Sequence, residues 1–325
     1  MYILLAMPDA GEYKTDLEAR FPGIPFFAVT SQKDMRGHIE KAEIIITIFR
    51  IADDLLSEAV NLKWIQVTTS GVNYLLGRPS LKKDVIITTC RGIHGPQVSE
   101  MAFLLMLALN RNFPQVIRNQ DRRIWERWPG MLLHHKKVGI VGLGVIGEEI
   151  ARKCKAFGMT VFGVDTLKKE LDSVDFFSGP EALPQVAEKV DYLILVVPST
   201  SETEKIVGAR VLERMKPTAF LINLARGEVV DEEALIEALA SGKIAGAALD
   251  ALPTEPLPEG HPLWGTKNVI ITPHVAGMSD NYREQVMPIV EENLRRFLDG
   301  ERRNLINFVE RYGDQPPIHT LKGGR

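Results

Sequence analysis

Apolar runs alternate with helix-like patterns along most of the chain. The runs lie at residues 2–7, 44–49, 64–69 and 85–90, and then at 137–142, 160–165, 192–198, 219–225, 244–250 and 268–274. Their nearly continuous Val, Ile and Leu content is typical of parallel strands covered by helices on both faces. One linking helix has clear end signals, with Asp231 as N-cap, Val230 and Leu235 as a hydrophobic staple, and Gly242 as terminator. The pattern predicts two doubly wound α/β domains with parallel sheets.

A long apolar stretch, PQVSEMAFLLMLALNRN at residues 96–112, follows the first series of runs. Its proline occupies a favoured first position of a helix, and apolar side chains cover most of its surface. We therefore expect a helix that is buried between domains or subunits. The apolar core of the stretch, residues 101–109, is too short to span a bilayer.

Composition limits the class of protein. The 325 residues are 45% hydrophobic and 25% charged, with a formal net charge of -3, and basic residues are interleaved with acidic ones. Cys90 and Cys154 give no disulfide framework and no zinc spacing, and His134-His135 lacks a second cluster at metal-ligand spacing. The N-terminus does not match a signal peptide, and residues 314–325 resemble a loose tail. We expect a cytoplasmic protein with no metal ion, no nucleic-acid partner and no membrane segment.

A glycine-rich turn lies within KKVGIVGLGVIGEEIARKCKAFG, where Gly142, Gly144 and Gly147 form the G-x-G-x-x-G arrangement. The arrangement alone is a weak signal, but here a strand precedes it, a helix follows it, and a second strand comes next. The first glycine permits the tight turn, and the second lets the backbone approach a pyrophosphate at the positive end of the helix. The third lets helix and strand pack closely. Packing alone would also explain such glycines, but the context favours a dinucleotide site.

Asp165 ends the second of these strands, at the offset expected of the acid that binds the adenine ribose. A carboxylate accepts hydrogen bonds from a ribose hydroxyl and repels a 2′-phosphate. The sequence therefore favours NAD over NADP as the cofactor. Lys168 and Lys169 follow closely enough to weaken that preference.

Three later strands end in residues with useful chemistry. Arg226 follows one strand, Asp250 and then Glu255 follow the next, and His274 follows the last. Carboxyl ends of parallel strands face the ligand crevice, so we expect these side chains beside the nicotinamide. Each has an ordinary alternative: a surface salt bridge for the arginine, a solvated loop for the glutamate and a strand cap for the histidine. Together they indicate a catalytic group.

Reduction of a 2-oxo acid needs these residue types. A hydride must reach the carbonyl carbon, and a proton must reach the carbonyl oxygen. A protonated imidazole can supply that proton, and an adjacent carboxylate stabilises its charged form and fixes its tautomer. A guanidinium can hold the substrate carboxylate with its planar fork and polarise the carbonyl.

With these motifs the sequence resembles the D-isomer-specific 2-hydroxyacid dehydrogenase family over nearly its whole length. The motifs are VGIVGLGVIGEEIA, VVPSTSETEKIV, MKPTAFLINLARGEVVDEEAL, the D-x-x-x-x-E-P of residues 250–256, and HPLWGTKNVIITPHVAG. The resemblance implies that Arg226 binds and polarises the substrate, Glu255 pairs with His274, and His274 is the acid/base. Departures from the family's pattern affect the shape of the pocket rather than its chemistry; they are Thr218, Ala251 and Leu252.

The resemblance also implies binding residues. Backbone N–H groups expected to bind the substrate carboxylate are those of Ser70, Gly71 and Val72. Cofactor contacts are expected from Gly142, Gly144, Val145, Ile146, Gly147, Asp165, Pro198, Thr203, Ala225, Asp250 and Gly277.

By the same resemblance, residues 1–93 with 285–325 form a discontinuous, flavodoxin-like substrate domain, and residues 94–284 form an inserted Rossmann domain for the cofactor. A homodimer is expected through the helix at residues 96–112 and the arm after it. Trp125 and Trp128 of that arm either close the partner's site or pack in the interface. Three other assignments stay open: His94 is more simply structural than substrate-binding, and Phe49 and Arg50 are candidates to select the substrate's side chain.

We therefore expect an NAD-dependent oxidoreductase that transfers a hydride between NAD(H) and a small 2-oxo acid or D-2-hydroxy acid. One alternative is an enzyme of the same fold acting on formate or phosphite, although relatives that act on formate carry glutamine where Glu255 stands. A second alternative is a dinucleotide-sensing binding protein like the corepressors built on this scaffold. The absence of long disordered flanking segments is an argument against that alternative.

Overall fold

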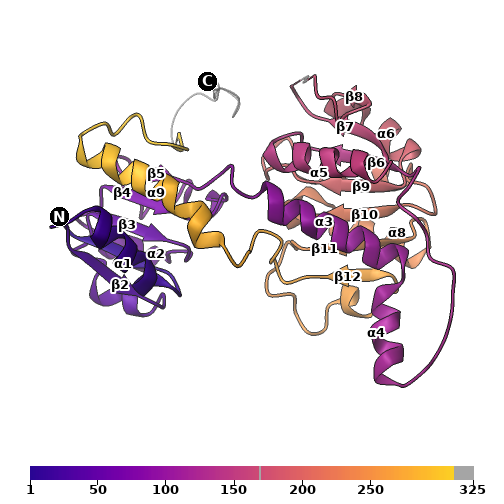
Figure 1. Cartoon of the computed structure of the whole chain (residues 1–325), viewed down its shortest axis with the longest axis horizontal. Helices are drawn as coiled ribbons and strands as arrows, with labels where there is room; N and C mark the ends of the chain where they lie inside the picture. The colour runs from indigo at the N-terminus through magenta and orange to yellow at the C-terminus, as the bar shows by residue number, and fades with distance from the viewer. Residues whose placement is uncertain (168–169, 311–325) are drawn as a thin grey trace. The chain divides into compact units, whose positions relative to one another are not determined.

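The chain forms two compact units, each built on its own parallel sheet (Figure 1). The computed structural model describes residues 1–167 and 170–310. The predicted effect of Lys168 and Lys169 and the predicted tail at residues 314–325 lie outside the described residues. Unit 1 contains Met1–Ile93 and the chain from Asn281 onward, and unit 2 contains His94–Asp280.

Unit 1 holds a five-stranded parallel sheet in the order β2-β1-β3-β4-β5. This is the strand order of flavodoxin-like folds, as expected. The strands are β1 (Ile3–Ala6), β2 (Phe26–Val29), β3 (Ile44–Thr47), β4 (Trp64–Val67) and β5 (Ile86–Thr88).

Helices cover both faces of this sheet. On one face α1 (Ala10–Arg20) and α9 (Tyr282–Leu298) join a cluster of buried side chains with β1 and β3. On the other face α2 (Asp53–Glu58) contributes Leu55 and Leu56. Short 3-10 turns are η1 (Asp34–Gly37) and η2 (Asn73–Leu75). Helix α9, which follows unit 2 in the sequence, thus packs in unit 1 with the N-terminal part of the chain.

Unit 2 holds a seven-stranded parallel sheet in the order β12-β11-β10-β9-β6-β7-β8. The order reverses between β6 and β9, as in the Rossmann fold, where ligands bind beyond the carboxyl ends of the strands. The strands are β6 (Lys137–Val141), β7 (Thr160–Val164), β8 (Phe176–Ser178), β9 (Tyr192–Leu195), β10 (Phe220–Asn223), β11 (Gly246–Leu249) and β12 (Val269–Ile271).

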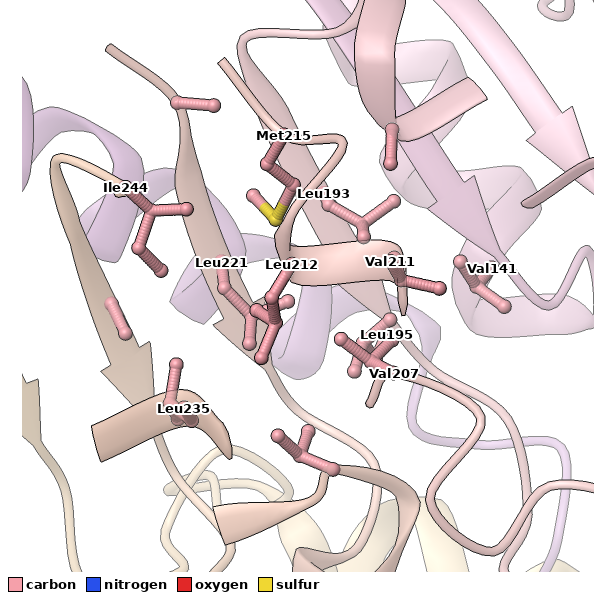
Figure 2. Close-up of a cluster of buried hydrophobic side chains, with 14 of the residues drawn as sticks. Val141, Leu193, Leu195, Val207, Val211, Leu212, Met215, Leu221, Leu235 and Ile244 are labelled. Atoms are coloured by element: carbon pink, nitrogen blue, oxygen red, sulfur yellow. The ribbon is translucent and has the colours of Figure 1, made fainter. Parts of the chain in front are cut away.

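Two hydrophobic clusters fill the two faces of the second sheet. One packs α3 (Gly95–Asn110) and α5 (Val145–Ala156) against the sheet. The other, drawn in Figure 2, packs α6 (Leu183–Lys189), α7 (Ala209–Leu212) and α8 (Glu232–Ala240) against the opposite face. The remaining helical segments are α4 (Phe113–Asp121), η3 (Pro180–Ala182), η4 (Gly227–Val229) and η5 (Pro262–Gly265).

The apolar runs predicted the central strands well and two edge strands not at all. Each predicted run contains a strand, whereas β2 and β8 were not predicted. Both lie at a sheet edge, where one side has no neighbouring strand among the described residues and burial is incomplete; Phe176 of β8 is 54% exposed. The predicted cap of α8 is confirmed, because the Asp231 side chain accepts from the Ala234 N–H at 3.3 Å.

Helix α3 is buried on one side only. Ala102 and Met106 lie in the core of unit 2, but Leu104 and Leu107 are 57% and 37% exposed. One side of α3 is therefore exposed in the single chain, and its burial between domains or subunits stays a prediction. Among residues 1–167 and 170–310, no helix combines the length and apolar character needed to cross a membrane.

Candidate active site

The glycine-rich turn joins β6 to α5 and has the geometry expected from its sequence. Gly142 has a φ of +98°, a conformation that side chains disfavour. A Cβ on Gly147 would lie 1.9 Å from the Gly142 carbonyl oxygen, so only glycine lets helix and turn approach so closely. A Cβ on Gly144, the N-cap of α5, would meet nothing within 4 Å. A ligand can therefore approach the backbone at the start of α5, where Val145 and Ile146 form the first turn.

Asp165 follows β7 and contacts this turn directly. Its Oδ2 accepts from the Leu143 N–H at 2.6 Å, and its Oδ1 accepts from the Leu167 N–H at 3.1 Å. The carboxylate thereby connects the end of β7 to the glycine turn. Its negative charge lies next to the turn, as an adenosine-binding acid requires.

Pro198 and Thr203 lie in one compact loop after β9. The Thr203 hydroxyl donates to the Pro198 carbonyl at 2.6 Å and accepts from the Thr200 N–H at 2.8 Å. The threonine therefore closes the loop in which both predicted cofactor contacts lie.

Arg226 follows β10 in a segment organised by Asn223. The buried Asn223 side chain donates to the Arg226 carbonyl at 2.9 Å and accepts from the Ala225 N–H at 3.0 Å. A Cβ on Gly227 would lie 2.0 Å from the carbonyl carbon of Leu252, so this turn packs directly on the segment after β11. The backbone that carries the guanidinium is thus closely held.

Asp250 organises the loop that carries His274. It is nearly fully buried, and its Oδ1 accepts from the Thr272 hydroxyl at 2.5 Å and from the Val275 N–H at 3.0 Å. Its Oδ2 accepts from the Ala276 N–H at 3.0 Å. The carboxylate therefore satisfies donors on both sides of the histidine.

His274 and Glu255 are in direct contact. The His274 Nδ1 lies 3.0 and 2.9 Å from Oε1 and Oε2 of Glu255. Oε1 also accepts from the Leu252 N–H at 3.0 Å, which orients the carboxylate. The imidazole is 36% exposed, and its backbone has a φ of +54°. Pairing at Nδ1 leaves Nε2 as the nitrogen for a reacting partner.

These residues share one edge of the unit 2 sheet. Arg226, Asp250 and His274 follow β10, β11 and β12, which are neighbouring parallel strands. Gly277 lies further along the His274 loop, and its carbonyl accepts from the Gln97 side chain at 3.5 Å.

The predicted carboxylate-binding loop belongs to unit 1. Ser70, Gly71 and Val72 follow β4, and Val72 is buried. The loop begins where the Thr68 N–H donates to the Thr47 carbonyl at 2.9 Å, and the Tyr74 hydroxyl after it donates to the Phe49 carbonyl at 3.4 Å. The Arg50 guanidinium lies 5.9 Å from the centre of the Tyr74 ring.

Sequence reasoning missed Asn223 and the contacts of Asp250 with the His274 loop. For Asn223 a signal was present, because a lone amide in the otherwise apolar FLIN strand is unusual and needs buried hydrogen-bond partners. For Asp250 the partners are backbone groups of another loop, and no sequence pattern identifies them.

Comparison with known proteins decides the family. The sequence profile described as "D-isomer specific 2-hydroxyacid dehydrogenase, NAD binding domain" matches residues 103–276, more than half of the chain. The chain belongs to the D-isomer specific 2-hydroxyacid dehydrogenase family. It is 32% identical over 293 residues to a glyoxylate reductase of Korarchaeum cryptofilum, covering 86% of this chain and 87% of that one.

Other relatives include a longer enzyme and two solved structures. A D-3-phosphoglycerate dehydrogenase of Methanocaldococcus jannaschii is 32% identical over 301 residues, and the match covers 90% of this chain but 57% of the relative. A family structure from Aeromonas salmonicida is 34% identical with a TM-score of 0.88, covering 95% and 98% of the two chains. One from Xanthobacter autotrophicus, described as a complex with NADPH and MES, is 30% identical with a TM-score of 0.80 and the same coverage.

Proposed function

We propose that this protein is an NAD-dependent oxidoreductase that transfers a hydride between the cofactor and a small 2-oxo or D-2-hydroxy acid. Family membership supports the general class. The contact between His274 and Glu255 is the observation that carries the chemistry, because it provides a paired imidazole at the ligand-binding edge of a Rossmann sheet.

His274 acts in this proposal as the acid/base. With Nδ1–H donated to Glu255, the charged ring presents Nε2–H to the substrate carbonyl oxygen, and its exposure gives the substrate access. The proton leaves Nε2 as the carbonyl becomes a hydroxyl, and returns to it in the reverse direction. Glu255 stabilises the imidazolium and holds the ring in one orientation.

Arg226 binds the substrate anion in this proposal. The guanidinium is always charged and planar, and it suits a carboxylate next to a carbonyl. From the family resemblance, we also assign the backbone N–H groups of Ser70, Gly71 and Val72 in unit 1 to binding of a substrate carboxylate. Phe49 and Arg50 help to select the substrate's side chain; the position of Arg50 over Tyr74, just after this loop, supports that role. Replacing Arg50 by alanine should change the ranking of 2-oxo acids by kcat/KM more than it changes the KM for the cofactor.

The residues around the glycine turn fit a dinucleotide. The open approach at Gly144, the N-terminus of α5 and the carboxylate of Asp165 suit a pyrophosphate and an adenine ribose. When bound, the nicotinamide donates or accepts the hydride. We propose NAD rather than NADP, because the charge of Asp165 opposes a 2′-phosphate.

An Asp165→Ser variant tests this preference. The ratio of kcat/KM with NADPH to kcat/KM with NADH should rise by about 10-fold, roughly the cost of one unfavourable charge contact. Asp172→Ser, at an exposed aspartate further along the chain, is the control and should leave the ratio unchanged. An unchanged ratio in Asp165→Ser would contradict the proposed preference.

Nicotinamide absorbance with a panel of substrates tests the reaction itself. The panel contains pyruvate, glyoxylate, hydroxypyruvate, phenylpyruvate and branched 2-oxo acids, with formate and phosphite assayed in the oxidative direction. We expect reduction of at least one 2-oxo acid with NADH. Turnover of formate or phosphite alone would assign the other enzyme class, and no turnover at all would overturn the proposal.

We also propose a homodimer through α3, α4 and the arm after them. An exposed apolar surface supports it, and Trp125 on the arm is 88% exposed. A surface of this kind is typical of an interface. A Leu104→Glu variant should shift the mass measured by light scattering from dimer to monomer, whereas Val60→Glu, at an exposed valine of unit 1, should not. Trp128 donates from its ring to the Arg111 carbonyl at 3.1 Å, which favours a packing role for that residue.

A further inference from the structure

His94 is a buried histidine for which the proposed reaction has no use. It is the first residue of unit 2, immediately before α3, and it is 9% exposed. Its ring lies against Gly277, because a Cβ on Gly277 would be 3.2 Å from the His94 Cδ2. Gly277 belongs to the loop that carries His274 and lies just before Asp280, where unit 2 ends. Both residues of this contact thus lie within unit 2, close to its two ends in the sequence.

The first turn of α3 touches other parts of the site as well. The Gln97 side chain donates to the Gly277 carbonyl at 3.5 Å. A Cβ on Gly95 would lie 3.3 Å from Cγ1 of Val145, in the first turn of α5. This single turn therefore contacts both the histidine loop and the start of the dinucleotide-binding helix.

His94 also experiences the charge of Arg226. Burial, and then the positive charge of Arg226, lower the pKa of His94 to about 4. The ring is therefore neutral at physiological pH. A neutral ring does not repel the guanidinium of Arg226, whereas a positively charged ring would.

We propose that His94 is a positioning residue, whose buried ring sets the position of Arg226 and of the Gly277 end of the His274 loop. This inference rests on the proposed function, because it assigns His94 to the reaction of those two residues. The ring contacts the His274 loop at Gly277 and experiences the charge of Arg226, so one buried side chain interacts with both loops.

A double-mutant cycle tests this role with NADH and the best 2-oxo acid of the panel. His94→Asn should lower kcat/KM by about 10-fold in the wild-type background, and by about 2-fold or less in an Arg226→Lys background, because the guanidinium that His94 positions is then absent. The dissociation constant for NADH, measured by fluorescence, should change by less than about 2-fold. If His94 had a purely structural role, His94→Asn would lower kcat/KM by the same factor in both backgrounds.

The matched control is His135→Asn, also in unit 2. His135 is exposed and has a φ of +62°, which asparagine tolerates, so kcat/KM should stay unchanged in both backgrounds. If His94→Asn does not fold, Gly277→Ala provides the second variant, because its methyl group presses on the His94 ring. Gly277→Ala should likewise lower kcat/KM more in the wild-type background than in the Arg226→Lys background.

The outcomes separate this inference from the proposed function. Additive losses in an active wild-type enzyme would overturn the role of His94 and leave the proposed function intact. Absence of wild-type turnover with every 2-oxo acid would overturn the proposed function and this inference with it.

Discussion

Each unit buries a group of polar side chains, and the two groups are built differently. In unit 1, Gln66 of β4 accepts from Thr88 of β5 at 2.7 Å and from Asn293 of α9 at 2.8 Å. Trp64 donates to the same threonine at 2.8 Å, and Asn293 also pairs with the backbone of Ile306. This network joins side chains of two strands and a helix.

In unit 2, Asn223 and Asp250 pair mainly with backbone groups. Asn223 contacts the backbone of Ala225 and Arg226, and Asp250 contacts the backbone of Val275 and Ala276. The bonds therefore determine the course of the loops that carry Arg226 and His274. Both groups satisfy the need of buried polar atoms for partners, but the first joins secondary-structure elements and the second shapes a reactive edge.

The largest expected effect separates catalysis from stability. His274→Ala should lower kcat by about 10²–10⁴-fold, the usual contribution of a general acid/base. The dissociation constant for NADH and the free energy of unfolding should change little, because the ring is partly exposed and contacts a partly exposed carboxylate. Steady-state kinetics, cofactor fluorescence and urea unfolding measure the three quantities. Equal losses in kcat and in cofactor affinity would contradict the assigned role.

Asp250→Ala should lower both the free energy of unfolding and kcat. It leaves the Thr272 hydroxyl and the N–H groups of Val275 and Ala276 without their acceptor. The free energy of unfolding should fall by about 4 kcal/mol, since each buried unsatisfied group costs about 1–3 kcal/mol and part of the loop relaxes. Because the His274 loop then loses its anchor, kcat should fall as well. Lowered stability with an unchanged kcat would show that Asp250 has a purely structural role, like the buried polar network of unit 1.

Asn293→Ala should affect stability alone. Its amide pairs with Gln66 and Ile306 inside unit 1, so its loss should lower the free energy of unfolding by about 3 kcal/mol. At a temperature where the variant is fully folded, kcat should match that of the wild type. A lowered kcat under those conditions would show that the polar network of unit 1 also affects catalysis, and would contradict the comparison.

The smallest effect is a pH dependence of stability. The pKa of His94 lies at about 4 in the folded protein, below its ordinary value, so the unfolded chain binds a proton first as the pH falls. The contribution of the neutral His94 ring to the free energy of unfolding is complete above the ordinary histidine pKa. It is lost as the pH falls toward the pKa of His94 in the folded protein. Between about pH 7 and about pH 5 the wild type should lose about 2 kcal/mol more than His94→Asn in urea unfolding. Equal losses would show that the ring is not buried as a neutral group.

Local sequence predicted the features that depend on neighbours along the chain. The central strands, the cap of α8 and the glycine turn each follow from a continuous segment, and the structure contains all three. The edge strands β2 and β8 escaped prediction because their apolar pattern is short and half exposed. The pairing of Glu255 with His274 was expected only from resemblance to a family, since nothing in the spacing of the two residues requires it.

The sequence by itself determined the two parallel α/β domains and the residue types available at the strand ends, because hydrophobic periodicity and turn chemistry act over a few residues. Only the tertiary structure decided which of those side chains meet. Asp250 holds the His274 loop, Asn223 holds the Arg226 turn, and His94 lies against Gly277. These contacts join segments far apart in the chain, and a buried polar group takes whichever partner the packed sheet brings within hydrogen-bonding distance.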